Sequence, residues 1–304
     1  MACSPAWWAA WPALLLASSA VADPGAFVEP SAPAPDAPAQ PPLGPLPPEL
    51  VAVALAVADR PLPERMAAIS AALLGLPYVT DPIGEGTGID ADPIARYDAF
   101  DCLTYTEEVL SLSLAGHPAH AAQVRAELRY GVGQDISYTN RRHFMELQWI
   151  PGVIRDGWLR DTTRDYGKTV TLTKEVTDST WQHWRSRRHF AHTDEQLPKG
   201  TMRLSVLPLE RAAEVAEQIR PGSIILTVRS DRPGVPLWVT HVSFLVPTSE
   251  GGTVMRHATK LGDGGTRDHD LAWYLQHLQG YTNWRVLGIS ILEPIEPGPR
   301  NGLK

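Results

Sequence analysis

The chain has 304 residues, of which 43% are hydrophobic and 20% charged, and its formal net charge is −7. This composition is too apolar for a disordered protein. The acidic balance argues against a nucleic-acid partner, because nucleic-acid-binding proteins usually carry a basic surface. The 2 cysteines exclude a disulfide-rich scaffold and a cysteine-rich zinc module.

Residues 1–22 have the pattern of a secretory signal peptide. They contain no charged side chain, residues 13–17 are apolar, and residues 20–22 read Ala-Val-Ala, a small-x-small cleavage motif. The alternative is an uncleaved membrane anchor, although the stretch falls short of the ~20 apolar residues that a span needs. We expect an exported protein of the periplasm or cell envelope, with no stable membrane span after cleavage.

A linker and one domain are expected after the signal peptide. Residues 23–48 hold 10 of the 28 prolines, a composition that cannot bury a core and favours an extended spacer. Residues 49–304 carry nearly all of the periodic pattern and are expected to form a single domain. Loss of Cys3 with the signal peptide leaves Cys102 without an internal disulfide partner, so this thiol is either buried and inert or reactive.

Taken in chain order, the periodic pattern predicts helices first and strands later. Apolar residues at helical spacing predict helices at residues 49–58, 63–76, 102–115, 118–129 and 208–219. β-Branched enrichment predicts strands at residues 223–229, 237–246, 253–258 and 286–292. This order indicates an α+β fold with N-terminal helices and a C-terminal antiparallel sheet.

Cys102 stands where a nucleophile would be built. It opens a predicted helix directly after Asp101, a plausible N-cap. A helix N-terminus and a nearby imidazole can lower a cysteine pKa from ~8.5 to ~3.5–7.5, so we expect an accessible, ionised thiol. The alternative is a buried, inert cysteine.

His241 is the candidate base for this thiol. It lies in a predicted strand whose Val242, Phe244 and Val246 share one face, so His241 and Ser243 share the other. A satisfied structural histidine is the alternative. The pattern places most of the other histidines on the surface or in loops: His117, His120, His183, His189, His192, His269 and His277. On the next predicted strand, His257 is placed to orient His241.

A metal site is the competing interpretation of the histidines. His189, His192 and Glu195 follow a ligand-like spacing, but they lie in a polar stretch with no clear helix and no matching third cluster. We therefore expect neither a metal nor another cofactor.

Several spaced motifs resemble one family. The resemblance runs from about residue 66 to residue 292 and rests on Leu74–Val79, Phe100–Cys102, Asp101–Glu107, Arg129-Tyr130, Tyr138–Phe144, Trp149-Ile150, Gly222–Ile225, Thr240–Val242 and Arg256–Ala258. Together these segments resemble the NlpC-type papain-like cell-wall hydrolases, and more narrowly their N-acetylmuramoyl-L-alanine amidase-like branch.

The resemblance implies a papain-like α+β fold, with Cys102 as nucleophile, His241 as base and His257 as the orienting group. The implied substrate is bacterial peptidoglycan or a muropeptide, cut at an amide.

Four residues are candidates for substrate binding: Asp101, Arg141, His143 and Trp149. Asp101 could bind a free amine of a stem peptide or only cap its helix. Arg141 and His143 could meet a substrate carboxylate or form a structural pair, and Trp149 could line a groove or pack in the core.

Three functions remain open from the sequence. The first is cleavage of the N-acetylmuramoyl-L-alanine bond, and the second is cleavage within the stem peptide by the same Cys/His site. The third, a catalytically silent wall-binding module, is disfavoured because Cys102, His241 and His257 are all present.

Overall fold

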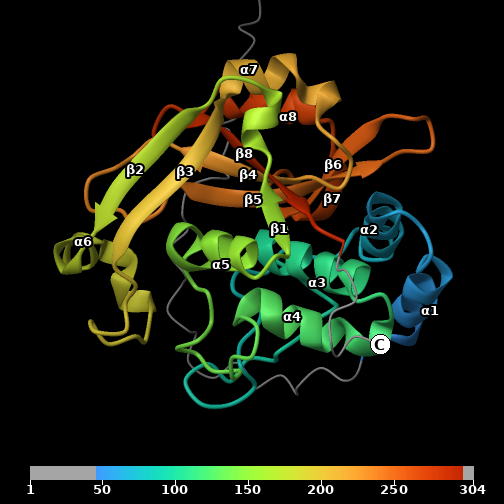
Figure 1. Cartoon of the computed structure of the whole chain (residues 1–304), viewed down its shortest axis with the longest axis horizontal. Coiled ribbons are helices and arrows are strands. Elements are labelled where there is room, and N and C mark those ends of the chain that lie inside the picture. Colours follow the sequence, from blue (N-terminus) through green and yellow to red (C-terminus); the bar gives the residue numbers. More distant parts are fainter. Residues whose placement is uncertain (1–45, 297–304) are drawn as a thin grey trace, which may run out of the picture.

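The computed structural model describes residues 46–296, which form an antiparallel sheet with helices on both faces (Figure 1). The helices are α1 (Pro48–Ala56), α2 (Leu62–Ala71), α3 (Cys102–Leu114), α4 (Ala121–Arg129), α5 (Ile150–Arg155), α6 (Asp178–His183), α7 (Leu209–Glu214) and α8 (Leu271–Leu278). The strands are β1 (Leu159–Asp161), β2 (Val170–Val176), β3 (Gly200–Pro208), β4 (Ile224–Arg229), β5 (Val239–Pro247), β6 (Thr253–Thr259), β7 (Gly265–His269) and β8 (Val286–Pro294).

The N-terminal expectations fall largely outside this region. The expected signal peptide, residues 1–22, and most of the expected linker, residues 23–48, lie outside the described residues. The first described helix, α1, begins at Pro48. In residues 46–296, no helix has both the length and the apolar character that crossing a membrane requires.

The 8-stranded sheet has the order β2-β3-β8-β4-β5-β6-β7, and β1 adds to β8. Every pairing between these strands is antiparallel. The β4–β5 register shifts so that Thr227 faces His241 but Val228 faces Val239, which leaves Thr240 as an extra residue. Such a bulge bends the strand and redirects the neighbouring side chain, and here it lies immediately before His241.

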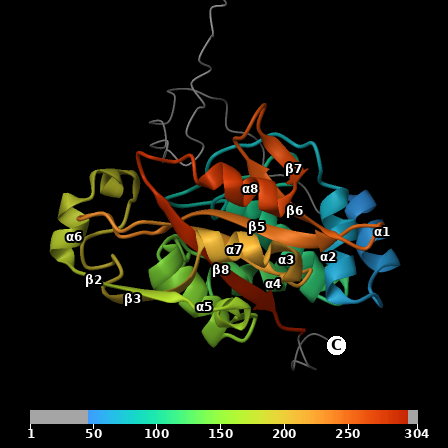
Figure 2. The same cartoon turned by 90° about the horizontal axis from the view of Figure 1, so that it is seen from above.

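Two apolar cores form on the opposite faces of the sheet. Val242 and Phe244 of β5 pack with Val109 of α3 in one core, whereas Leu245 packs with Leu275 of α8 in the other. The predicted alternation along β5 is therefore confirmed. Figure 1 shows α3 and α4 below the sheet and α7 and α8 above it, and Figure 2 shows α1 and α2 at the end opposite the β2–β3 hairpin.

The predicted order of helices followed by strands is too simple. The strands β1, β2 and β3 precede α7, and α8 lies between β7 and β8. The hairpin strand β2 escaped prediction because most of its residues are exposed, so no apolar alternation is required. Strand β7 escaped it because Arg267 and Asp268 occupy its centre.

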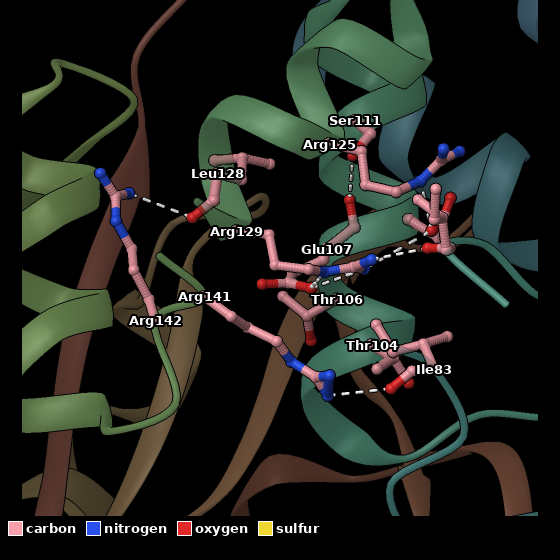
Figure 3. A network of polar contacts seen from close by, with 12 residues as sticks. Ile83, Thr104, Thr106, Glu107, Ser111, Arg125, Leu128, Arg129, Arg141 and Arg142 are labelled. Carbon is pink, nitrogen blue, oxygen red and sulfur yellow. Dashed lines mark hydrogen bonds and ion pairs between the residues drawn. The ribbon is translucent and has the colours of Figure 1, made fainter. Parts of the chain in front are cut away.

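Buried ion pairs fix α3 against α4 (Figure 3). Arg125 Nε donates to Glu108 Oε1 at 2.6 Å, and Arg129 Nε donates to Glu107 Oε2 at 2.9 Å. The second oxygen of Glu107 accepts the indole N–H of Trp149 at 2.9 Å. The ion-paired side chains are at most 7% exposed, so each charge depends on its partner.

We predict that Arg129→Met lowers the free energy of unfolding by about 3–5 kcal/mol, because it leaves the Glu107 carboxylate buried without its cation. Urea unfolding at neutral pH measures the change. The matched control is Arg60→Met, which removes an exposed partner of Glu64 at 3.9 Å and should cost less than about 1 kcal/mol. Equal losses in the two variants would contradict the role given to the buried pair.

Candidate active site

Cys102 is the first residue of α3, and Asp101 caps this helix. The Asp101 carboxylate accepts hydrogen bonds from the Thr104 backbone N–H and hydroxyl group, each at 2.8 Å. The Asp101 backbone N–H donates in return to Thr104 Oγ1 at 3.0 Å. This reciprocal capping box confirms the predicted helix start and cap, and it holds the Cys102 side chain at the positive end of α3.

Cys102 and His241 line the same pocket, which has a volume of about 350 Å³. This volume lies within the range of small-ligand sites. Three of the residues nominated for substrate binding also line the pocket: Asp101, Arg141 and His143. The pocket therefore joins the start of α3, the start of β5 and the segment between α4 and α5.

A chain of three histidines leads away from this pocket. His241 Nε2 lies 2.7 Å from His257 Nδ1, so the predicted adjacency of these two residues is present. His257 Nε2 in turn lies 2.8 Å from His269 Nδ1. His257 is 0% exposed, whereas His269 is partly exposed. His269 is partly exposed, as a surface position would be, but it lies on strand β7, which was not predicted, and not in a loop.

Tyr274 of α8 packs against the first two histidines. Its ring centroid lies 6.1 Å from that of His241 and 5.8 Å from that of His257. Its hydroxyl group shares a 3.0 Å hydrogen bond with Thr227 Oγ1, which fixes the ring. Tyr274 was missed because α8 was not predicted.

Glu146 anchors the backbone just before His241. It lies in a π-helical segment, Met145–Trp149, and its Oε1 accepts the backbone N–H groups of Trp238 and Val239, each at 2.5 Å. Burial raises the pKa of the Glu146 carboxyl to about 7, although these two hydrogen bonds oppose the shift. Nothing local in the sequence marked Glu146, since its partners lie far along the chain.

Burial sets the protonation of both candidate reacting groups. Burial, and then the charge of Asp101, raises the pKa of the Cys102 thiol to about 12, despite hydrogen bonds to its sulfur from the backbone of Val242 and Leu103. Burial, and then Arg229, lowers the pKa of His241 to about 4. At neutral pH the site holds a neutral thiol and a neutral imidazole. These shifts favour a neutral thiol over the expected ionised one, because lost hydration outweighs the partial charge of the helix end.

Arg141 is committed to contacts within the protein. Its guanidinium contacts Asp90 at 2.8 Å, Asp81 at 3.2 Å and Glu85 at 3.4 Å, and it donates to the Ile83 carbonyl at 2.8 Å. These contacts hold the loop between α2 and α3 as one wall of the pocket. Arg141 therefore shapes the pocket and does not offer a free cation to a ligand.

His143 is a neutral pocket residue. Its Nε2 donates to the Tyr138 carbonyl at 2.8 Å. Burial, and then Arg141, lowers the pKa of His143 to about 3. It can therefore take part in hydrogen bonds with a ligand, but it does not provide a positive charge at neutral pH.

Trp149 does not line the pocket, so its nomination for substrate binding is wrong. It is 0% exposed, and its indole N–H donates a hydrogen bond to Glu107. Its large apolar ring is more stable in the core once this one polar group is satisfied.

The two histidines with ligand-like spacing, His189 and His192, have different surroundings. His192 packs against the rings of Tyr138 and His143, whereas His189 lines the pocket. Among residues 46–296, no group of three or more His, Cys, Asp or Glu side chains is arranged to hold a metal ion.

We predict that iodoacetamide labels Cys102 with an apparent pKa above the ordinary ~8.5. The raised pKa means that thiolate forms only as the pH rises through the alkaline range. A Cys3→Ser background isolates the signal. Asp101→Asn should lower this apparent pKa, because it removes a neighbouring charge while asparagine still caps the helix. Labelling with an apparent pKa at or below ~8.5 would contradict the prediction.

Comparison with solved structures shows the same fold in proteins from bacteria. Protein LPG0564 of Legionella pneumophila, of the DUF1460 family, matches with a TM-score of 0.69 and 21% identity, covering 81% of this chain and 93% of that one. An N-acetylmuramoyl-L-alanine amidase from Bacteroides uniformis matches with a TM-score of 0.59 and 22% identity, covering 77% of this chain and 98% of that one. None of the curated proteins compared matches the chain.

The family comparison covers most of the described domain. Residues 68–281 match the AmiA-like family, described as N-acetylmuramoyl-L-alanine amidase-like. The matched region includes Cys102, His241, His257 and His269, together with the pocket that Cys102 and His241 share. The chain belongs to the N-acetylmuramoyl-L-alanine amidase-like family.

Proposed function

We propose that this protein is a cysteine-dependent peptidoglycan hydrolase that cleaves the amide between N-acetylmuramic acid and L-alanine. The observation that carries the proposal is the shared pocket of Cys102 and His241, with His241 hydrogen-bonded to His257 at 2.7 Å. A thiol, a base and a group that orients the base are the parts of a cysteine hydrolase. Membership of the amidase-like family supports the cell-wall substrate.

The proposal includes a papain-like fold of the NlpC type. It is supported by a cysteine at the start of a helix that packs on an antiparallel sheet, with the histidine on a strand of that sheet. It also includes export to the periplasm or cell envelope, where peptidoglycan is found. Support for export comes from the apolar, uncharged segment 1–22.

Acylation starts from two neutral groups. The Cys102 sulfur attacks the amide carbonyl carbon while its proton passes to His241. Because Nε2 of His241 is engaged by His257, Nδ1 is the ring nitrogen that receives this proton. The imidazolium then protonates the amine nitrogen, the C–N bond breaks, and a thioester remains on Cys102.

Deacylation reverses the proton movement. His241 takes a proton from water, the oxygen attacks the thioester carbon, and the C–S bond breaks. The thiol then recovers its proton from His241. We propose that the Cys102 backbone N–H, at the start of α3, donates to the oxyanion in both steps. Asp101 and His143 are the pocket residues that we propose for substrate binding.

The decisive experiment is digestion of purified peptidoglycan with the full chain, followed by mass analysis of the new ends. We expect a new L-alanine amine and a muramic acid carboxyl group. Cys102→Ala should give no product, whereas His117→Asn, at an exposed position away from the pocket, should keep full activity. A new amine inside the stem peptide would instead identify an endopeptidase, and no product from any bond would reject the proposal.

We predict a graded series at His257. His257→Ala should reduce kcat, by as much as ~10⁴-fold if His241 loses its productive tautomer. His257→Gln should retain part of the activity, because its amide oxygen can still accept the hydrogen bond from His241. Steady-state kinetics measures kcat of each variant, and thermal unfolding checks that each variant is folded. Full activity in His257→Ala would exclude an orienting role.

A further inference from the structure

His269 extends the histidine pair to the edge of the sheet. It lies on β7, which pairs with β6 through His257 opposite Arg267 and Met255 opposite His269. The histidine chain therefore crosses β5, β6 and β7, adjacent strands in Figure 1, and it leads from the pocket to a partly exposed ring. The ring of His269 stacks on Trp273 at 4.9 Å and 15°, which fixes its plane.

The two hydrogen bonds have the same direction. In each of them, Nε2 of the inner ring meets Nδ1 of the next ring outward. A neutral imidazole has one donor nitrogen and one acceptor nitrogen. If each ring carries its proton on Nε2, every ring donates outward, and Nδ1 of His241 is free to accept a proton from Cys102.

A proton that enters this chain need not leave its charge at His241. When Nδ1 of His241 gains a proton, its Nε2 proton can move to Nδ1 of His257. The Nε2 proton of His257 can then move to Nδ1 of His269. Each N–H bond that breaks is matched by one that forms, so one positive charge arrives at His269 and no other reactant is needed.

Burial explains why the charge would move outward. His257 is completely buried, and burial holds its pKa well below the usual value. The cationic form of its imidazole is therefore unfavourable. His241 has a pKa of about 4 for the same reason and is by itself a weak base towards the Cys102 thiol. His269, at the edge of the sheet, is partly exposed and has a neighbouring carboxylate, Asp268.

We propose that His269 is the outer end of a proton relay that carries the charge received by His241 away from the pocket. His269 acts through His257 and does not touch the substrate. The inference rests on the proposed cysteine-dependent hydrolysis, but the relay can also be observed in the resting protein without turnover.

The relay predicts how activity depends on pH. His269 faces His257 on β6, Arg267 and Asp268 on its own strand, and Trp273 and His277 on α8. Burial and Arg267 lower its pKa, Asp268 opposes this, and His277 lowers it slightly further. His269 is therefore neutral at pH 7. Once the pH falls through its pKa, the chain already holds a proton and cannot accept one from Cys102, so activity is lost on the acid side.

Nitrogen-15 NMR of the histidine rings tests the relay in the unmodified protein. As His269 titrates, His257 should switch from the Nε2–H to the Nδ1–H tautomer with the same midpoint. If His257 keeps one tautomer throughout that titration, the relay is excluded, whatever the protein hydrolyses. If the linked switch occurs but peptidoglycan is not cut, the relay stands and the proposed function fails.

Kinetics of His269→Gln supply the second test. Glutamine can accept the hydrogen bond from His257 but cannot hold the charge, so kcat should fall about 10- to 100-fold with KM unchanged. The acid limb of kcat/KM should also move to lower pH, because a proton must now be held on a buried ring. His277→Gln, at a ring that stacks on Trp273 at 5.3 Å, is the matched control and should leave kcat unchanged. A lower kcat with an unmoved acid limb would show a purely structural role and overturn the relay.

Discussion

The contact between the start of α3 and β5 is the constraint on which the candidate site depends. It sets the Cys102 sulfur against the backbone N–H of Val242, the residue directly after His241. The capping box at Asp101 fixes the helix end, and the bulge at Thr240 with the Glu146 anchor fixes the strand. The geometry of the site is thus produced mainly by backbone hydrogen bonds, which tolerate little displacement.

The same contact has an electrostatic cost. Packing the helix end on the sheet removes water from Cys102 and His241, so both prefer their neutral forms. The neutral pair is therefore favoured over a thiolate–imidazolium pair as the resting state. The chain of imidazoles behind His241 links this base, through the fully buried His257, to a second partly exposed ring at the edge of the sheet.

Paired charges surround the pocket and give it shape. Glu107 and Arg129 join α3 to α4 (Figure 3). Arg141 pairs with three carboxylates of the neighbouring loop. Such pairs often add little net stability compared with apolar packing, but a broken buried pair costs several kcal/mol. They therefore oppose alternative arrangements of the pocket wall more than they strengthen the fold.

The sequence by itself determined the elements with strong periodicity and the residues with distinctive local chemistry. The helix beginning at Cys102, its Asp101 cap, the faces of β5 and the pairing of His241 with His257 all follow from patterns within about 20 residues. Tertiary structure decided what depends on burial and on distant partners. It reversed the expected pKa of Cys102, moved Trp149 into the core and brought His269 and Glu146 to the site. The physical reason is that desolvation and long-range hydrogen bonds are properties of the packed chain, and no local spacing of residues records them.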